Sequence, residues 1–303
     1  MHIVSASDDG YVPHFAALLH SAWLYNPAAS YTLLASKVSE DNLALLRDFA
    51  RRRRIALEIV NCDDRIAGLR VKPGFTTSTW SRLFIPDLLP VSVGRAIYLD
   101  ADITVTGSLD ALIAKDLRGK AVAAAPDGVE ATAARERATH GTSEANDYFN
   151  TGVLLFDLAL WRAEQITEKI ISFANTEAEL LLLDQSALNV VLEGRILAIG
   201  KEWNFFYLGN IRDIPDPKII HYAGSTKPWR LRLSPFYDLY RVHRSHTPWP
   251  LADVPFPPGG RLKMLRRKFG AWLGLERYRA MGEISGPALE RARGLVKGRD
   301  FPA

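Results

Sequence analysis

The sequence predicts an α/β fold with a mostly parallel central sheet, followed by a basic helical tail. Strand-like and helix-like segments alternate over the first two hundred residues, which is typical of a parallel sheet with helices on both faces. The chain has 303 residues, 48% hydrophobic and 24% charged, so it is long enough to bury a sizeable core. Beyond about residue 235 prolines and basic residues replace the alternation, which predicts a second region outside the sheet.

Apolar runs of strand length recur along the chain. We expect strands over residues 2–6, 31–35, 55–60, 95–99, 121–125, 152–156, 195–199 and 218–222. Helical patterns fall between them, over about residues 13–25, 39–54, 157–175 and 184–193. Ser39, Asp157 and Asp184 are N-cap residue types at the starts of the last three helices. Since such sheets bind ligands beyond the carboxyl ends of their strands, polar residues at those ends are the first candidates for a site.

The composition excludes several classes of protein. Cys62 is the only cysteine, so no intrachain disulfide can form, and we interpret it as a buried packing residue. No stretch approaches the ~20 apolar residues of a membrane-spanning helix, and the start lacks a signal-peptide pattern, so we expect a cytoplasmic protein. No nucleic-acid partner is expected, because helix-turn-helix, zinc-ligand and RNA-binding strand patterns are missing. The missing Gly-x-Gly-x-x-Gly argues against a NAD-dependent oxidoreductase.

Positive charge is concentrated at the C-terminus. The net charge is +4, but residues 261–299 alone hold eleven Lys or Arg against three Glu. Between residues 261 and 274 apolar side chains recur at helical spacing with basic ones between them: Leu262, Leu265, Phe269, Trp272 and Leu273, with Lys263, Arg266, Arg267 and Lys268. Such a helix can lie in an anionic membrane interface, here on the inner face. It can equally pack its apolar stripe on the rest of the protein and leave its charges in water.

The most informative motif is an acidic triplet. Asp100, Ala101 and Asp102 directly follow the strand expected over residues 95–99. Two carboxylates two residues apart can converge on one Mg²⁺ or Mn²⁺, and such a cation can bridge the phosphates of a nucleotide. Taken alone, the triplet is equally a polar turn. His221, on a late strand, is a plausible further ligand.

Three more polar clusters lie at the ends of expected elements. Backbone N–H groups around Gly224 and the ammonium of Lys227 could hold a diphosphate. Asn150, just before a buried strand, could hydrogen-bond a sugar hydroxyl. Asp184 and Gln185 open a helix and face whatever the preceding loop faces. Each also has an ordinary structural explanation: a solvated lysine, the start of a strand and a helix cap.

In combination and order, these motifs resemble glycosyltransferase family 8, the retaining UDP-sugar transferases that include bacterial lipopolysaccharide galactosyl- and glucosyltransferases and the glycogenins. The resemblance spans roughly residues 1–230. It rests on Ile-Val-x-Ala-x-Asp-Asp from Ile3, Tyr-Leu-Asp-x-Asp from Tyr98, Phe-Asn-x-Gly-Val-Leu-Leu from Phe149, Asp-Gln-x-x-Leu-Asn from Asp184 and His-Tyr-x-Gly-x-x-Lys-Pro-Trp from His221. It implies a Rossmann-like, nucleotide-binding catalytic domain of the GT-A type over residues 1–235. A Pro-rich connection and the basic amphipathic region would occupy residues 236–303.

The resemblance also implies roles for individual residues. Asp100, Asp102 and His221 would bind Mn²⁺, with Mg²⁺ as the alternative ion. The nucleotide-sugar would contact Asp8, Asp9, Tyr11, Arg82, Asp100, Ala101, Asn150, Gly224 and Lys227. The reaction centre would be lined by Gln185, Asp184 and Asp127. Ala101 is smaller than the residue the family usually has there, and Gly10 stands where relatives often carry a polar residue.

The activity implied is metal-dependent, retaining transfer of glucose or galactose from a UDP-sugar to a hydroxyl of a saccharide or lipid-linked saccharide. The pathway would be lipopolysaccharide or other cell-surface glycan synthesis. Gln185 is a poor nucleophile, so front-face substitution, in which the leaving diphosphate accepts the acceptor's proton, stands beside a covalent route. Two alternatives remain open: a glycogenin-like, self-glucosylating enzyme, and a non-catalytic module that binds nucleotide or glycan.

Overall fold

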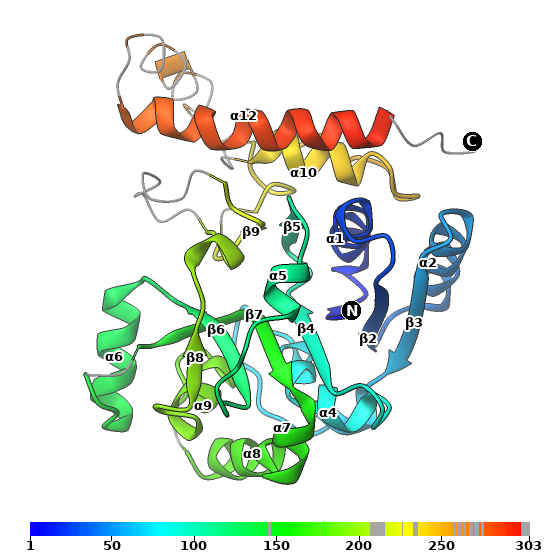
Figure 1. Ribbon diagram of the computed structural model, residues 1–303. Coiled ribbons are helices and arrows are strands. Elements are labelled where there is room, and N and C mark those ends of the chain that lie inside the picture. The colour runs from blue at the N-terminus through cyan, green and yellow to red at the C-terminus, as the bar shows by residue number, and fades with distance from the viewer. Residues whose placement is uncertain are drawn as a thin grey trace.

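The computed structural model describes residues 1–297 except 145–146, 178, 207–215, 226, 233–235, 257–258, 260–261, 263–264, 267–268, 270–272 and 274–275. In this part of the chain a twisted central sheet has helices on both faces, and two late helices lie across one side (Figure 1). The predicted α/β class is confirmed.

The central sheet has seven strands in the order β3-β2-β1-β4-β7-β6-β8. Their bounds are β1 (His2–Asp8), β2 (Ser30–Ser36), β3 (Ala56–Asn61), β4 (Arg95–Leu99), β6 (Val122–Pro126), β7 (Phe149–Asp157) and β8 (Ile196–Ala198). Strand β7 pairs antiparallel with both β4 and β6, and the other pairs are parallel. The start of β7 therefore lies at the same edge as the carboxyl ends of β1, β4 and β6, which is where the candidate site forms.

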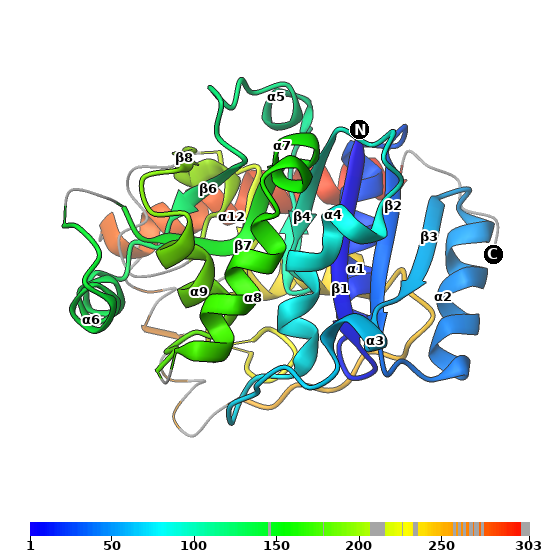
Figure 2. The same cartoon turned by 90° about the horizontal axis from the view of Figure 1, so that it is seen from below.

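Both faces of the sheet are buried under helices. Successive residues of β4 alternate between two core clusters, Ile97 and Leu99 in one and Ala96 and Tyr98 in the other. The first cluster includes α1 (Val12–Tyr25) and α2 (Glu40–Arg52). The second lies under η1 (Thr77–Phe84), α4 (Ile85–Leu88), α7 (Leu158–Ala163), α8 (Ile166–Thr176) and α9 (Asp184–Val191), several of which stand in front of the sheet in Figure 2. Burial on both faces explains why these strands read as continuous apolar runs.

The last predicted strand belongs to a separate sheet. Strand β9 (Ile219–His221) pairs antiparallel with β5 (Ile103–Val105), which directly follows the acidic triplet and which the sequence did not predict. Ile103 lies opposite His221, and the Tyr222 N–H donates to the Asp102 carbonyl over 2.9 Å. This two-stranded sheet therefore fixes the predicted histidine ligand beside the predicted carboxylates.

Two helix starts are capped as predicted, and one is not. The Asp157 carboxylate accepts from the Leu160 N–H (2.9 Å) and the Ser39 hydroxyl from the Asn42 N–H (3.4 Å). The predicted Asp184 cap is wrong, because Leu183 holds the N-cap position and Asp184 is the first helical residue. The helix predicted over 157–175 is also two helices, α7 and α8, interrupted where Gln165 adopts a positive φ of 52°. The other helices before residue 230 that the sequence did not predict are η1 and α4, described above, with α3 (Asp63–Ile66), α5 (Asp110–Ile113), α6 (Glu130–His140) and η2 (Lys201–Trp203).

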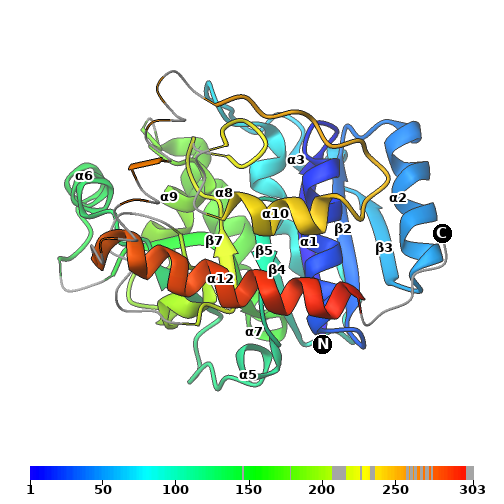
Figure 3. The same cartoon turned by 90° about the horizontal axis from the view of Figure 1, so that it is seen from above.

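The C-terminal region contributes two helices that pack on the sheet domain. Helix α10 (Tyr237–Arg244) and α12 (Glu276–Lys297) run side by side over α1 (Figure 3). Ala288 and Ala292 of α12 are buried in a cluster with Phe205 and Tyr222. Helix α12 confirms the helical tail expected from the sequence, although that helix was placed over residues 261–274, and the proposed division at residue 235 stays a prediction.

The basic helix predicted over residues 261–274 is only partly described. Its described apolar members, Leu262, Leu265, Phe269 and Leu273, are 55–61% exposed, so they do not form a buried stripe on the sheet domain. Lys263, Arg267, Lys268 and Trp272 lie outside the described residues. No helix in the described part of the chain is long and apolar enough to cross a bilayer.

Ala292→Leu should destabilise the fold, because Ala292 is fully buried against the sheet domain. Overpacking of this kind costs about 1–3 kcal/mol, which should lower the midpoint of urea unfolding. Gly294→Ala is the control on the same helix, because an added Cβ there meets nothing within 4 Å. The control should be neutral or stabilise by up to about 1 kcal/mol. Equal midpoints for the two variants would contradict the docking of α12.

Candidate active site

The acidic triplet is held at the carboxyl edge of the sheet by the antiparallel partner of β4. The Asp100 N–H donates to the Gly152 carbonyl over 2.8 Å, which continues the β4–β7 ladder by one residue. Ala101 is buried in the core cluster on the α1 face. Its neighbours Asp100 and Asp102 are partly exposed, as expected for alternating side chains.

Asp100, Asp102 and His221 come together as the sequence predicted. One ligand atom from each lies within 4.8 Å of the others. His221 Nε2 is 3.2 Å from Asp102 Oδ1 and 3.8 Å from Asp100 Oδ2. Two carboxylates and an imidazole are a donor set suited to Mn²⁺.

Gly152 keeps this cluster open. A Cβ at residue 152 would lie 2.3 Å from His221 Cε1 and 2.9 Å from Asp100 Oδ2. Only a residue without a side chain therefore lets the imidazole and the carboxylate approach the same stretch of backbone. The residues present fit a divalent cation in both chemistry and space.

Lys227 lies against the same cluster. Its ammonium donates to Asp102 Oδ2 and, over 2.7 Å, to the Tyr222 carbonyl. Burial alone would raise the pKa of Asp102, but His221 and Lys227 hold that pKa well below its usual value. The loop before Lys227 includes Gly224 with a φ of 76°, a conformation that favours glycine.

A stacked pair of rings anchors this loop to α1. His14 and Trp229 stack with centroids 3.7 Å apart, and His14 Nδ1 lies 2.7 Å from the Tyr240 hydroxyl. Burial lowers the pKa of His14 to about 3, so the ring is neutral. Tyr11 meets the edge of Trp229 at 5.7 Å, which joins the N-terminal loop to the Lys227 loop.

Arg82 links the acidic triplet to α9. Its guanidinium is 5% exposed and lies 3.0 Å from Asp100 Oδ1 and 2.9 Å from Asp184 Oδ2. It also donates to the Thr151 carbonyl over 2.6 Å. Burial raises the pKa of Asp184 to about 7, against the opposing effect of Arg82. Arg82 therefore contacts both carboxyl groups, and Asp184 is not the N-cap residue of α9 because it already lies within the first helical turn.

Asp127, Asn150 and Gln185 form a second buried group beside the triplet. Asp127 Oδ2 accepts from Asn150 Nδ2 (3.1 Å) and from Gln185 Nε2 (3.2 Å). Gln185 Oε1 accepts from the Thr151 N–H over 3.1 Å. All three predicted residues are less than 10% exposed, and their polar atoms are tied to one another.

The N-terminal residues divide into two groups. Asp8 Oδ1 accepts from the Tyr11 N–H (3.1 Å) at the end of β1, on the same edge as the triplet. The Asp9 carboxylate instead accepts from the Ser39 N–H, the Ser39 hydroxyl and the Asn42 amide, each over 2.7–2.8 Å. The assignment of Asp8, Asp9 and Tyr11 to nucleotide binding stays a prediction.

The sequence did not point to Asn204. This residue is 2% exposed, and its side chain joins His221 to Asn150. Its only signal in the sequence is an amide between two aromatic residues, Trp203 and Phe205, shortly before the last strand.

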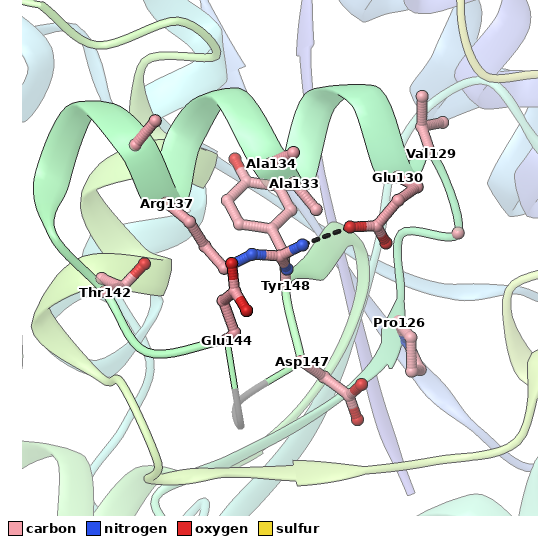
Figure 4. Close-up of a pocket in the computed structure, with 12 residues that line it drawn as sticks. Pro126, Val129, Glu130, Ala133, Ala134, Arg137, Thr142, Glu144, Asp147 and Tyr148 are labelled. Atoms are coloured by element: carbon pink, nitrogen blue, oxygen red, sulfur yellow. Dashed lines mark hydrogen bonds and ion pairs between the residues drawn. The ribbon is translucent and has the colours of Figure 1, made fainter.

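A cavity of about 640 Å³ adjoins Asp127 on the side of α6 (Figure 4). Pro126 and Gly128, on either side of Asp127, contribute to its wall. The labelled side chains of Arg137 and Tyr148 lie side by side in Figure 4, and Arg137 is paired with Glu130. The wall of the cavity is thus partly polar and charged, and it includes the chain neighbours of Asp127.

Comparison with known proteins agrees with this geometry. The profile of glycosyl transferase family 8 matches residues 2–232. General stress protein A of Bacillus subtilis (strain 168) is 28% identical over 274 residues, 82% of this chain and 94% of that protein. The lipopolysaccharide 1,2-glucosyltransferase of Escherichia coli (strain K12) is 30% identical over 213 residues, 65% of this chain and 62% of that protein.

The fold is similar to that of the galactosyltransferase LgtC, whose crystal structure is in complex with donor and acceptor sugar analogs. The TM-score is 0.73 over 87% of this chain and 100% of that one, at 22% identity, so this likeness concerns the fold alone. The profile match covers most of the chain and includes every residue of the candidate site. The protein therefore belongs to glycosyltransferase family 8.

Proposed function

We propose that the protein is a metal-dependent, retaining hexosyltransferase that uses a UDP-sugar donor and a saccharide acceptor. The observation that carries the proposal is the cluster of Asp100, Asp102 and His221 around one point, with Gly152 leaving room for it. A non-catalytic glycan-binding module would need no such cluster. The name of the Escherichia coli relative, a lipopolysaccharide glucosyltransferase, supports a hexose and a cell-surface glycan.

Asp100, Asp102 and His221 would hold Mn²⁺ or Mg²⁺. When bound, such a cation supplies charge stabilisation for a departing diphosphate. Lys227 would also stabilise the charge of the diphosphate, because its ammonium lies at the cluster, on a loop anchored by Trp229. Backbone N–H groups near Gly224 would add uncharged donors.

The pairing of the site's carboxylates supports front-face substitution. Asp184 is 1% exposed and held by Arg82, and Asp127 already accepts from two amides. Gln185 uses both ends of its amide, toward Asp127 and Thr151. In the front-face route the bond from the anomeric carbon to the diphosphate breaks, the acceptor oxygen bonds that carbon on the same face, and the acceptor proton passes to the diphosphate. In this route the protein positions the two substrates and stabilises charge, and it needs no nucleophilic side chain.

The acceptor would approach through the cavity beside α6. Its wall includes Pro126 and Gly128, the chain neighbours of Asp127, and Tyr148, two residues before Asn150. Its polar walls suit a saccharide, whose hydroxyls need donors and acceptors.

The tail would hold the enzyme at an anionic membrane surface. Supporting this proposal, Leu262, Leu265, Phe269 and Leu273 are more than half exposed within a strongly basic segment. Apolar residues among basic ones suit the interface of anionic lipids. A lipid-linked saccharide would then be a natural acceptor.

Asp102→Asn should reduce sugar transfer by about 100-fold or more, because it removes a charge and a ligand from the cluster. Transfer is measured as UDP release over a panel of UDP-hexoses with saccharide acceptors, and the anomeric configuration of the product is read by NMR. Asp116→Asn, at an exposed position, is the control and should keep the wild-type rate.

Three results would contradict parts of this proposal. Wild-type transfer that survives exhaustive EDTA would exclude the metal. A β-linked product from an α-linked donor would exclude retention. A gain of hexose mass by the protein itself, with no added acceptor, would favour the self-glucosylating alternative.

Asp184 by itself should lower the stability of the fold as pH rises from about 4 to about 7, whereas the buried His14 and His243, whose pKa values burial lowers to about 3, act in the opposite direction over much of this range. Over this range the folded state keeps a proton on Asp184, whose pKa is about 7, while the unfolded chain has released it near 3.8. The loss at pH 7 is at most about 4 kcal/mol. In urea unfolding measured against pH, Asp184→Asn should gain stability relative to wild type as pH rises from about 4 to about 7, and Asp116→Asn should not. An unchanged slope in Asp184→Asn would show that Asp184 stays ionised beside Arg82.

Leu262→Glu/Leu265→Glu should abolish binding to vesicles that contain anionic lipid, in cosedimentation at low salt. Because both side chains are more than half exposed, the free energy of unfolding in urea should stay within about 0.5 kcal/mol of wild type. The control is Leu45→Glu, an exposed leucine of α2 outside the tail, which should bind vesicles as wild type does. Wild-type protein that fails to bind at low salt would refute the membrane proposal.

A further inference from the structure

We propose that Asn204 is a positioning residue that fixes the tautomer of His221, so that Nε2 presents its lone pair to the metal site. The inference rests on the proposed metal site and adds a residue outside it. It follows from one chain of buried amides, in which each hydrogen bond dictates the direction of the next.

The chain starts at Asn150, whose orientation is set from two sides. The Gly152 N–H, which can only donate, points at Asn150 Oδ1 over 3.0 Å. The Asp127 carboxylate faces Asn150 Nδ2 over 3.1 Å. A backbone donor on one side and a carboxylate on the other leave one orientation for this amide: oxygen toward Gly152, nitrogen toward Asp127.

Asn150 then orients Asn204. Asn150 Oδ1 also faces Asn204 Nδ2 over 2.8 Å, so Asn204 donates to it. The Asn204 oxygen is thereby directed at His221 Nδ1, 2.9 Å away. Turning Asn204 over would set its amide oxygen against the amide oxygen of Asn150. In a side chain that is 2% exposed, leaving such groups unpaired costs about 1–3 kcal/mol each.

His221 must therefore donate from Nδ1. A neutral imidazole with its proton on Nδ1 has its lone pair on Nε2, the atom that lies 3.2 Å from Asp102 Oδ1. A metal-binding histidine needs this arrangement, since its second nitrogen usually donates to a neighbouring acceptor that fixes both tautomer and ring orientation. Here the acceptor is an amide oxygen rather than a carboxylate or backbone carbonyl.

The backbone around Asn204 is rigid enough to hold this position. The Phe205 N–H donates to the Ile219 carbonyl (3.0 Å), and the His221 N–H donates to the Phe205 carbonyl (2.8 Å). Asn204 is therefore tied to the strand that carries His221, and the two side chains cannot move apart independently.

The first test needs no variant of Asn204. Long-range ¹H–¹⁵N NMR of the metal-free wild-type protein, recorded under conditions in which the His221 ring carries one proton and with His221 assigned by comparison with His221→Gln, should show a protonated Nδ1 and an unprotonated Nε2. A protonated Nε2 in the neutral ring would overturn the proposal.

The second test compares two buried asparagines. Asn204→Leu should weaken Mn²⁺ binding, measured by EPR of free Mn²⁺ in the presence of UDP, by about 10- to 100-fold. The matched control is Asn189→Leu. Asn189 is 7% exposed and its amide bridges the Phe149 backbone, without contact to His221, so Mn²⁺ affinity should stay close to wild type. Equal weakening in both variants would assign Asn204 a merely structural role.

Asn204→Asp serves if Asn204→Leu fails to fold. The carboxylate still accepts from His221 Nδ1 but opposes Asn150 Oδ1, so the Nδ1–H tautomer should persist while Mn²⁺ affinity stays above that of His221→Gln. Loss of the Nδ1–H signal in this variant would overturn the proposal. Wild-type protein that binds no Mn²⁺ with UDP, yet shows the Nδ1–H tautomer, would refute the metal site alone.

Discussion

The antiparallel pairing of β4 with β7 is the constraint on which the site depends. It places the start of one strand beside the end of the other, so the Asp100 N–H reaches the Gly152 carbonyl over 2.8 Å. Residues from two distant parts of the sequence, the acidic triplet and the Asn150–Gly152 segment, then share one edge. Had β7 run parallel, its polar start would lie at the far end of the sheet.

Three charged side chains, Arg82, Asp100 and Asp184, lie in contact at this edge of the sheet. Asp100 would be a poorly solvated carboxylate without Arg82, and Arg82 would be a buried cation without Asp100 and Asp184. Burial alone would lower the pKa of Arg82, but the two carboxylates raise it, so the guanidinium stays charged. A buried charge is tolerated only when it is paired, so removing any one of these three side chains would destabilise the fold through the others.

The sequence was sufficient for eight of the nine strands in the described part of the chain and for the cluster of Asp100, Asp102 and His221. The eight predicted strands all exist, and Asp100, Asp102 and His221 lie together. An apolar run that ends in carboxylates can be recognised in the sequence alone. The sequence could not predict the direction of β7, because a strand that is buried on both faces has the same apolar run whether it is parallel or antiparallel to its neighbours.

Other features had too weak a local signal to be predicted. Strand β5 has only three residues, and its partner β9 follows more than a hundred residues later. Asn204 carries no motif, because its role comes from the orientation of two neighbouring amides rather than from its residue type. The sequence suggested Asp184 as an N-cap because aspartate is a favoured residue type at that position. In the structure Asp184 is instead the first helical residue, and its carboxyl group contacts the guanidinium of Arg82.

The pairing of Lys227 with Asp102 would make any cation bound at this site share its carboxylate with an ammonium. Lys227 contacts Oδ2 and leaves Oδ1, the oxygen beside His221, for the cation, so the two positive charges would compete for one negative charge. The affinity for the cation would then improve with any new partner for the ammonium. A nucleotide diphosphate is such a partner, so ion and nucleotide should each strengthen the binding of the other through a single lysine.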